Sequence, residues 1–230
     1  KIKGLLRKEE RFFGFVPNDE HEKDPRNLRY EDIAPMGAIT IPESGDTEDR
    51  PWGLNQGHSS SCTCHSSVQA FYNRDASSPK LSPRYAFKRI RSDSAYPSSG
   101  LQWGAYMRDS VALKIKEGVC EYELCPNTNI ASDKDFLAFT ITPNMTNNAR
   151  KYTGGSYIYV TNGGRTENEK FEDIVRYMAE QNDGVKVGVT WRTSFNDARR
   201  TGIVPTQPPS GDVLGHDMFA VAWKKINGHE

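Results

Sequence analysis

The residues best suited to chemistry in this chain lie in one short stretch, residues 55–62, which reads Asn-Gln-Gly-His-Ser-Ser-Ser-Cys. A side-chain amide, Gln56, stands six residues before a cysteine, Cys62, at the expected start of a helix. The positive end of a helix dipole, together with a nearby imidazolium, lowers the pKa of a thiol and favours the nucleophilic thiolate. Cys62 is therefore a candidate nucleophile for acyl transfer, and the Gln56 amide and the Cys62 backbone N–H are candidate donors to a developing oxyanion.

An acyl transfer also needs an acid/base group, and His216 has surroundings that suit this role. Gly215 before it leaves room for a substrate, and the apolar run 218–221 behind it suits a strand that holds the ring rigid. Because Cys62 and His216 lie far apart in the chain, the fold has to bring two distant segments together across a cleft.

The elements that would position these residues change in character along the chain. Three segments of the first half have apolar residues at helical spacing and predict helices: 62–74, 81–91 and 105–117. Three short β-branched or aromatic runs of the second half predict strands: 156–160, 185–191 and 218–223. One further segment of the second half, 167–181, returns to helical spacing with acidic residues early.

Helices first and strands afterwards predict an α+β fold, in which a helical lobe packs beside a barrel-like strand lobe and the site lies between them. Residues 1–50 mix charge, Pro and Gly with little periodicity, which predicts an extended N-terminal segment on the surface. We expect residues 51–118 to form the helical lobe with Cys62 and residues 119–230 to form the strand lobe with His216. Together the two lobes would make one catalytic unit.

The residues around the candidate nucleophile resemble the papain-like family of cysteine peptidases. Asn-Gln-Gly at 55–57, followed by Ser61 and Cys62, matches the motif of that family. Thr63 stands where an aromatic residue is common, which looks more like the bacterial, archaeal and viral branches. Ser59 replaces a cysteine that normally forms a disulfide, so the resemblance implies that this bridge is absent.

The resemblance continues after Pro51 in the order of the family. Similar segments lie at 81–83, 99–105, 117–120, 125–126, 201–205 and 214–216. In the family a Gly-Gly turn pairs its backbone with an extended substrate. By resemblance this substrate-binding role falls to Ser99 and Gly100, with Gly215 beside the histidine.

The resemblance implies a thiol protease, a cysteine endopeptidase that attacks peptide carbonyls with Cys62, passes protons through His216 and holds the oxyanion with Gln56. Its partner would be a polypeptide substrate, with no metal and no organic cofactor. Three departures favour the alternative of a papain-fold binding or structural protein with impaired hydrolysis. They are Thr63, Asp217 directly after His216, and the lack of a clear match to the Asn that orients the histidine. The Asp217 carboxylate would either stabilise an imidazolium or point to solvent.

Simpler interpretations of the cysteines and the histidine compete with this one. Cys62 alone could be a buried structural thiol, since free cysteine behaves as a small hydrophobe, and His216 alone could be a strand histidine. A zinc site could draw on Cys62, Cys64, His65, His58, Cys120 and Cys125, but Cys-x-Cys lacks the usual spacer of structural zinc sites. Cys120 and Cys125 either bridge or pack as separate thiols.

Composition narrows the partners further. The chain has 30 Lys+Arg and 30 Asp+Glu, so no broad electrostatic field favours nucleic acid. No apolar run approaches the roughly 18 residues that cross a bilayer, so we expect no membrane span. Neither the first residue, Lys1, nor the number of cysteines decides a compartment.

The end of the sequence carries a hairpin signal. Asn227-Gly228 suits a type I′ turn, and only His229 and Glu230 follow it. We therefore expect the chain to stop inside a hairpin, before the strand that bears the orienting Asn in the family. A second chain or a further segment would then complete the strand lobe along residues 218–223.

Overall fold

The computed structural model describes residues 14–17, 24, 27–33, 40–47, 54–74, 77–128, 132–161, 164–192 and 213–224. Its α-helices are α3 (Tyr30–Ile33), α4 (Cys62–Arg74), α5 (Pro83–Ser92), α6 (Met107–Lys116), α7 (Asp133–Leu137), α8 (Pro143–Ala149) and α9 (Glu167–Gln181). Its 3-10 helices are η2 (Pro97–Gly100), η3 (Tyr122–Leu124) and η4 (Arg150–Tyr152). Its strands are β1 (Ser44–Asp46), β2 (Val185–Arg192), β3 (Val213–Ala220) and β4 (Ala222–Lys224). No helix within these ranges is long and apolar enough to cross a membrane.

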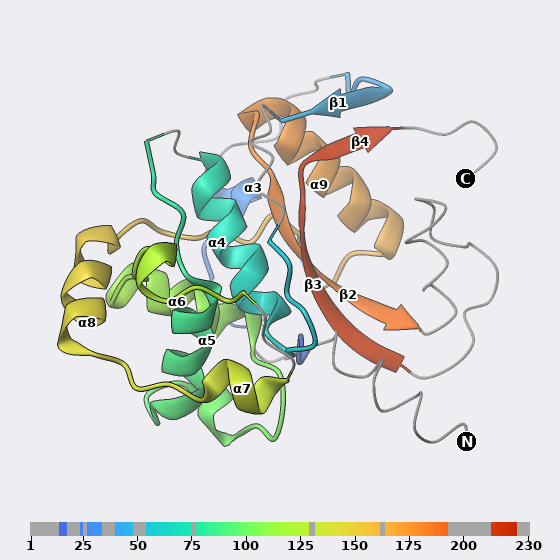
Figure 1. Ribbon diagram of the computed structural model, residues 1–230. Coiled ribbons are helices and arrows are strands. Elements are labelled where there is room, and N and C mark those ends of the chain that lie inside the picture. Colours follow the sequence, from blue (N-terminus) through green and yellow to red (C-terminus); the bar gives the residue numbers. More distant parts are fainter. Residues whose placement is uncertain are drawn as a thin grey trace.

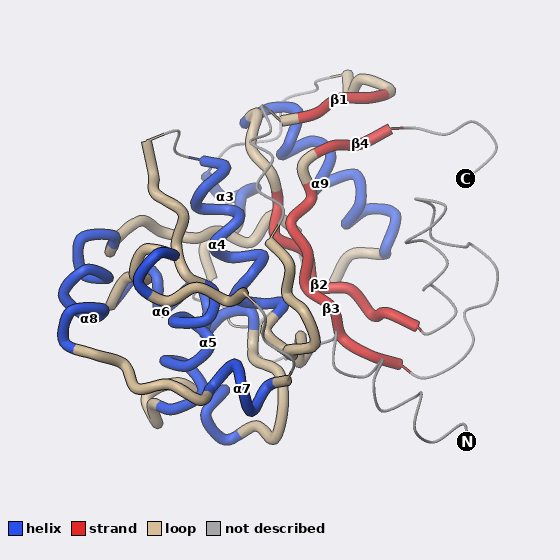
Figure 2. Tube along the Cα trace, in the orientation of Figure 1, coloured by secondary structure: helices blue, strands red, loops and turns tan. Residues whose placement is uncertain are grey.

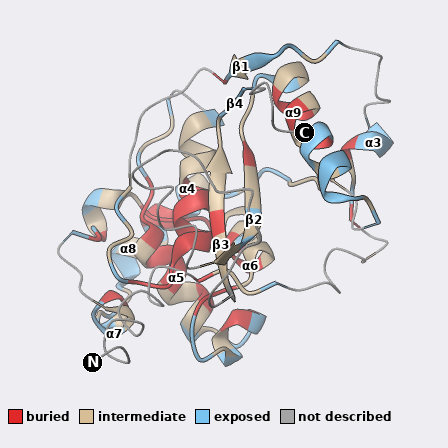
Figure 3. Cartoon of the chain, turned by 90° about the vertical axis from the view of Figure 1, so that its right-hand side faces the viewer, coloured by how far each residue is buried: buried red, intermediate tan, exposed pale blue. Residues whose placement is uncertain are grey.

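The elements form a helical lobe and a strand lobe that meet at α4 (Figure 1). In the helical lobe, helices α4 to α8 surround one apolar core, and Figure 3 shows the buried residues concentrated where α4, α5 and α6 meet. This core consists of Cys64, Val68, Leu81, Tyr85, Ala86, Phe87, Ile90, Tyr96, Ala105, Leu113, Val119, Cys120, Cys125, Phe136 and Ala149.

The strand lobe is built on the antiparallel pair β2 and β3, which lies between α4 and α9 (Figure 2). Alternate residues of a strand point to opposite faces. Lys186 and Asp217 face α4, whereas Val185 lies in a second core with α9. The buried members of this second core are Tyr30, Tyr177, Met178 and Val185. The last strand, β4, pairs in antiparallel fashion with β1, so an early segment of the chain closes one edge of the strand lobe.

Several helices begin and end at residues that satisfy their free backbone groups. The Ser82 side chain accepts a hydrogen bond from the backbone of Tyr85 at the start of α5, and Pro83 occupies the first turn. Thr166 and Glu169 form a capping box at the start of α9, and Asn182 ends that helix with a positive φ of 48°. These local signals explain why the segments with helical spacing form helices.

Most predicted elements agree with the structure, but one strand prediction is wrong and another has different bounds. The run 156–160 is not a strand, because Tyr159 makes a single bridge to Arg29 and no neighbouring strand extends the pairing. The strand predicted at 218–223 begins earlier, at Val213, and breaks after Ala220. The prediction missed the first half of this strand because Gly215 and Asp217 interrupt its apolar pattern. Gly215 lies against Phe15, and Asp217 faces α4.

Two parts of the expected domain division also change. Helices α7 and α8 lie beyond residue 118 yet contribute Phe136 and Ala149 to the helical core. We therefore propose a boundary between the lobes near residue 153. The N-terminal segment is not confined to the surface, because Gly14 and Tyr30 are buried. The segment 201–205 and the Asn227-Gly228 turn lie outside the described residues.

Candidate active site

Cys62 is the first residue of α4 and is only 1% exposed. The helix starts there because the Ser61 carbonyl accepts hydrogen bonds from the backbone N–H groups of Cys64 at 3.0 Å and His65 at 3.1 Å. Ser61 is itself fully buried. The structure thus places Cys62 in the first turn of a helix, as the sequence predicts.

The surroundings of Cys62 keep its thiol protonated in this structure. Burial raises the pKa of Cys62 to about 12, and the Asp217 carboxylate raises it further. Hydrogen bonds from the backbone N–H groups of Asp217 and Gly14 lower it, as does the positive charge of Lys186. The thiol therefore touches β3 at the residue next to His216.

His65 anchors the start of α4 on the side of the helical lobe. Asn127 donates from Nδ2 to His65 Nε2 at 2.8 Å, which leaves the proton on Nδ1 to be donated to the Ser61 carbonyl at 3.0 Å. The same amide donates to the Asn55 carbonyl at 3.1 Å. Burial lowers the pKa of His65 to about 4, so the ring is neutral near pH 7. We name Ser61, His65 and Asn127 the His65 cluster.

The loop before α4 is fixed by its own hydrogen bonds and by one carboxylate. The Ser60 backbone N–H donates to Asp133 Oδ1 at 2.6 Å, and the Ser60 hydroxyl donates to Asp133 Oδ2. Half-buried Gln56 donates from Nε2 to the Ser59 carbonyl at 2.6 Å. One of the two N–H groups of the Gln56 amide is thus used within the loop.

His216 lies on β3, opposite Val189 of β2. The residue is half-buried, and its ring packs edge-on against Trp191, with 5.8 Å between ring centroids and an interplanar angle of 74°. Cys62 and His216 therefore come from a helix of one lobe and a strand of the other. The contact between the two elements runs through the backbone of Asp217.

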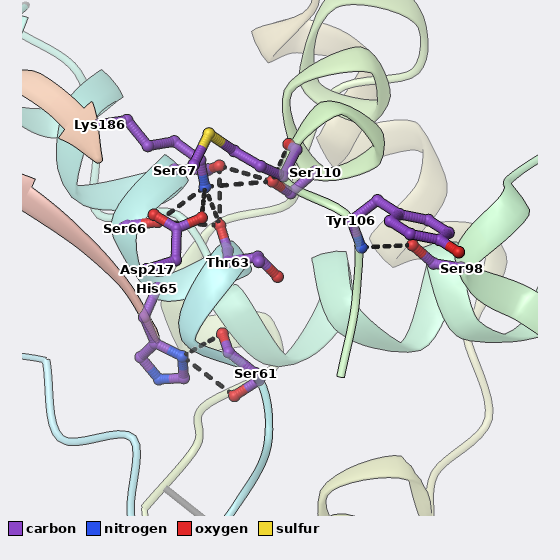
Figure 4. A network of polar contacts seen from close by, with 11 residues as sticks. Ser61, Thr63, His65, Ser66, Ser67, Ser98, Tyr106, Ser110, Lys186 and Asp217 are labelled. Carbon is purple, nitrogen blue, oxygen red and sulfur yellow. Dashed lines mark hydrogen bonds and ion pairs between the residues drawn. The ribbon is translucent and has the colours of Figure 1, made fainter. Parts of the chain in front are cut away.

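Asp217 neither points to solvent nor stands alone. Its side chain is 0% exposed, and its Oδ2 lies 2.7 Å from Lys186 Nζ. Lys186 also donates to the Thr63 carbonyl at 2.6 Å and to the Ser66 hydroxyl at 2.7 Å (Figure 4). Burial raises the pKa of Asp217 to about 6, against the lowering effect of Lys186. We name Thr63, Ser66, Lys186 and Asp217 the Lys186 cluster.

Residues 14–16 of the same chain lie at the junction of the two lobes, directly over the site. Gly14 and Val16 exchange backbone hydrogen bonds with Ala105, at 2.7 and 3.2 Å, on the helical side. Phe15 donates to the Gly215 carbonyl at 3.2 Å on the strand side. A Cβ on Gly215 would lie 1.9 Å from the Phe15 carbonyl oxygen, so only glycine allows this approach.

The side chain of Phe15 extends this contact. A Cβ on Gly188 would lie 2.7 Å from the Phe15 ring and 2.9 Å from the end of Met107. The ring therefore lies against a position on β2 where any larger residue would displace it. Gly188 faces Asp217 across the strand pair, so Phe15 lies on the same face of the sheet as the Lys186 cluster.

The predicted substrate residues Ser99 and Gly100 lie elsewhere than expected. Both belong to η2, where Gly100 is exposed and a Cβ added to it would meet no atom within 4 Å. The backbone that pairs with an extended segment is that of Ala105, a few residues later. Gly100 therefore makes no backbone pairing with residues 14–16, whereas Ala105 does. The substrate-binding role predicted for Ser99 and Gly100 stays a prediction.

The cysteines and histidines offer no metal centre within the described part of the chain. No group of three or more His, Cys, Asp or Glu side chains there could hold a metal ion. All four cysteines are free and buried, so Cys120 and Cys125 are separate thiols in the helical core.

The comparisons with known proteins agree with this arrangement. No family model matches the chain, and no curated protein sequence matches it. Xylellain, a cysteine protease from Xylella fastidiosa, superposes with a TM-score of 0.72 at 18% identity, over 94% of this chain and 81% of that chain. Procathepsin B S9 from Trypanosoma congolense gives a TM-score of 0.60 at 14% identity, over 97% and 75%.

The chain has the papain fold. A third neighbour with this fold is procathepsin L 3 from the larval midgut of Tenebrio molitor, with a TM-score of 0.60 at 15% identity, over 98% of this chain and 65% of that chain. At such identities the likeness establishes the papain fold and not the roles of single residues.

Sequence reasoning missed three features of this papain-fold site. It did not assign the pairing of Ala105, although the Trp103-Gly104-Ala105 run was visible. It found no partner for Asp217, because Lys186 lies on another strand. It assigned no role to residues 14–16, whose short apolar run carries no motif. Only the glycines at positions 188 and 215 hinted that another segment comes close, through its side chains at Gly188 and through its backbone at Gly215.

Proposed function

We propose that this protein is a cysteine endopeptidase in which Cys62 attacks the peptide carbonyl and His216 carries the proton. One observation supports the proposal above all: Cys62 opens a helix, and its sulfur contacts the backbone of β3 at the residue beside His216. A helix N-terminus and a neighbouring imidazole are two features that activate a cysteine for nucleophilic catalysis. The cysteine proteases that share the fold point the same way.

The proposed reaction assigns a role to each residue. Proton transfer from Cys62 to His216 would give the thiolate, which adds to the carbonyl carbon, and the Cys62 backbone N–H and the Gln56 amide would hold the oxyanion. The imidazolium then returns its proton to the leaving amine, and water releases the acyl group with His216 as base. Ala105 and Gly215 present backbone groups suited to an extended substrate, and Ser99 and Gly100 are proposed to border it.

A substrate can reach these groups only when residues 14–16 have left. The segment uses the backbone groups of Ala105 and Gly215, and burial is the largest cause of the raised pKa of Cys62. Two of the structural neighbours are proenzymes by name. We therefore propose that the structure represents a latent state, in which departure of Gly14–Val16 opens the site. Exposure of the thiol to water then lowers its pKa by more than the loss of the hydrogen bond from Gly14 raises it, because burial is the larger effect.

A second candidate function is a papain-fold binding protein without hydrolysis. The observation that favours it is the state of the two polar groups that catalysis needs. Cys62 is protonated and covered, and Gln56 is hydrogen-bonded within its own loop. A protein that binds a peptide at Ala105 and Gly215 would need neither group.

One experiment separates these functions. The wild-type chain and a Phe15→Ala variant, which weakens the contact of the segment with Gly188, are treated with a peptidyl epoxide, and the adducts are mapped by mass spectrometry. A parallel sample is incubated with denatured casein under reducing conditions. We expect labelling at Cys62 and casein cleavage, both faster in Phe15→Ala, with Cys120 unlabelled as the internal control.

The outcomes divide cleanly. Labelling of Cys62 without cleavage of any of several substrates supports the binding protein. Labelling that avoids Cys62 in both proteins, or cleavage that persists in Cys62→Ala, rules out the proposed peptidase.

A further inference from the structure

We propose that Lys186 is a positioning residue for the active site, whose ammonium group ties the first turn of α4, beginning with Cys62, to the strand that carries His216. The inference rests on the proposed function, because the role it assigns is in the reaction of Cys62. Sequence motifs gave no sign of it, since Lys186 is an isolated lysine within an apolar strand.

The geometry of the ammonium group is fully determined. Its three N–H donors have three partners within 2.7 Å: the Thr63 carbonyl, the Ser66 hydroxyl and Asp217 Oδ2. The side chains of the ion pair are 11% and 0% exposed, so water does not compete for these bonds. Figure 4 shows the lysine reaching from its strand into the first turn of α4.

Stability alone does not explain this placement. A buried ion pair gains little net free energy, because removing two charges from water offsets their attraction. A cation beside the first turn of a helix is also unfavourable, because the N-terminal end of the helix dipole is already positive. The position of Lys186 is therefore not one that stabilises α4.

The neighbours of Lys186 explain what the position achieves. Thr63 directly follows Cys62, and Asp217 directly follows His216, so one ammonium group holds the residues next to both proposed catalytic side chains. The backbone N–H of Asp217 also bonds to the Cys62 sulfur. A shift of Lys186 would displace the thiol and the histidine strand relative to each other, which the reaction tolerates poorly.

The network extends to a third element. The Ser110 hydroxyl of α6 lies 3.4 Å from Lys186 Nζ and 2.8 Å from the Ser67 hydroxyl of α4. Because α6 begins two residues after Ala105, the residue that pairs with residues 14–16 is linked through α6 to the same lysine.

Charge gives this arrangement a second consequence. Lys186 and Asp217 act on the Cys62 thiol with opposite signs, the lysine favouring the thiolate and the carboxylate disfavouring it. The titratable groups that act on the thiol are Cys64 on α4, Lys186 on β2 and Asp217 on β3. His65 lies three residues after Cys62 on α4, and His216 directly precedes Asp217 on β3. The facing part of α6 contributes the uncharged Ser110, and residues 14–16 carry no charge.

The test measures the rate at which iodoacetamide alkylates Cys62 as a function of pH, in the Phe15→Ala background, which is designed to expose the site. We expect Lys186→Met to shift the labelling profile to higher pH and Asp217→Asn to shift it to lower pH. Lys186→Arg keeps the charge and should retain most of the wild-type profile. Where peptidase activity is present, Lys186→Met should lower kcat/KM on the order of 100-fold, mainly through kcat.

A matched control removes a second partly buried ion pair outside the site. Arg165 Nε lies 3.0 Å from Asp173 Oδ2, and the Asp173 side chain is 8% exposed on α9. The variants Arg165→Met and Asp173→Asn should leave the labelling profile of Cys62 unchanged. Urea unfolding of every variant separates loss of fold from loss of positioning.

Two results would overturn the proposal. One is a labelling profile that moves in the same direction, or not at all, in Lys186→Met and Asp217→Asn. The other is unchanged hydrogen exchange at the start of α4 in Lys186→Met. Hydrogen exchange needs no reactive thiol, so it judges the positioning role even where Cys62 is never labelled and the proposed peptidase function itself fails.

Discussion

The first turn of α4 contacts the rest of the helical lobe through neutral hydrogen bonds, and it contacts the strand lobe through hydrogen bonds from a charged group, the Lys186 ammonium. On one side, the His65 cluster links Ser61 to Asn127 with an uncharged imidazole. On the other side, the Lys186 cluster links Thr63 to Asp217 with an ammonium group. Both clusters are largely buried, yet removing a residue from one or the other is expected to change stability by different amounts.

The first turn of α4 thus serves packing through the His65 cluster and the proposed chemistry through the Lys186 cluster. Neutral bonds between parts of the same lobe fix a shape and add little electric field. Charges at the junction between the lobes act on the thiol from a distance. When one partner is removed, the other is left as an uncompensated buried charge. The side of α4 that faces the proposed chemistry is the side that carries the charges.

The largest effect is expected for Lys186→Met, which leaves the Asp217 carboxylate buried without its cation. We expect the free energy of unfolding to fall by about 3–5 kcal/mol, as for other broken buried pairs. Urea unfolding at pH 7 measures it. The control is Lys88→Met, which removes a lysine that donates to the Leu137 carbonyl at 2.9 Å in the helical lobe and should cost about 1 kcal/mol. Equal losses in both variants would contradict the difference between the clusters.

The second-largest effect is expected when acid protonates His65 and lowers the free energy of unfolding. His65 has a pKa of about 4 in the folded protein against an ordinary value of 6.5, so unfolded chains bind more protons between these values. Stability from His65 is present above pH 6.5 and is lost as pH falls through 4, by about 3 kcal/mol. Asp217 opposes this, because its raised pKa makes its contribution grow as pH falls below 6. A His65→Gln variant isolates the difference: its unfolding free energy should lack the acid loss seen in wild type, and parallel curves would disprove the assignment.

A smaller loss is expected when the neutral cluster is broken at its amide. Asn127→Ala removes the donor to His65 Nε2 and to the Asn55 carbonyl, which should cost about 1–3 kcal/mol at pH 7. Asn147, which lies on the surface of α8, provides a matched asparagine, and Asn147→Ala should change stability by no more than about 0.5 kcal/mol. Thermal and urea unfolding both report the difference, and a loss above that of Lys186→Met would reverse the comparison.

The smallest change in stability is expected when both charges are replaced together. In Lys186→Met combined with Asp217→Leu, no charge is left unpaired, so we expect a stability within about 1 kcal/mol of wild type or above it. A double-mutant cycle with the single variants yields the coupling energy. A double variant as unstable as Lys186→Met alone would show that packing, and not charge, dominates this side of α4.

Local signals carried the successful part of the sequence prediction. The bounds of α4 and α9 agree with the predicted 62–74 and 167–181, because a serine run and a capping box mark their starts. The placement of Cys62 in the first turn of a helix followed from the same patterns, whereas the predicted strand began two residues after His216. The α+β class was likewise confirmed by the papain-fold neighbours.

Contacts between distant segments could not be predicted in this way. The partner of Asp217 lies on β2, and its identity depends on the register that sets Gly188 opposite Asp217. The start of the strand at Val213 was missed because Gly215 and Asp217 interrupt its apolar pattern. Gly215 allows the close approach of Phe15, and Asp217 pairs with Lys186. Tertiary pairing decides such positions, so a single sequence shows the residues without showing the partners.

Under the proposed function, the position of Gly14–Val16 makes this segment a competitor of every peptide that binds to the protein. Because the segment belongs to the chain whose Ala105 and Gly215 it occupies, its effective concentration stays fixed however far the protein is diluted. A free peptide would then bind only the fraction of molecules from which the segment has left, and its apparent Kd would be its intrinsic Kd divided by that fraction. With one molecule in about a hundred open, every peptide ligand would bind about a hundredfold more weakly than the bare site allows. Affinities measured on the full chain would then report the opening equilibrium as much as the fit of the ligand.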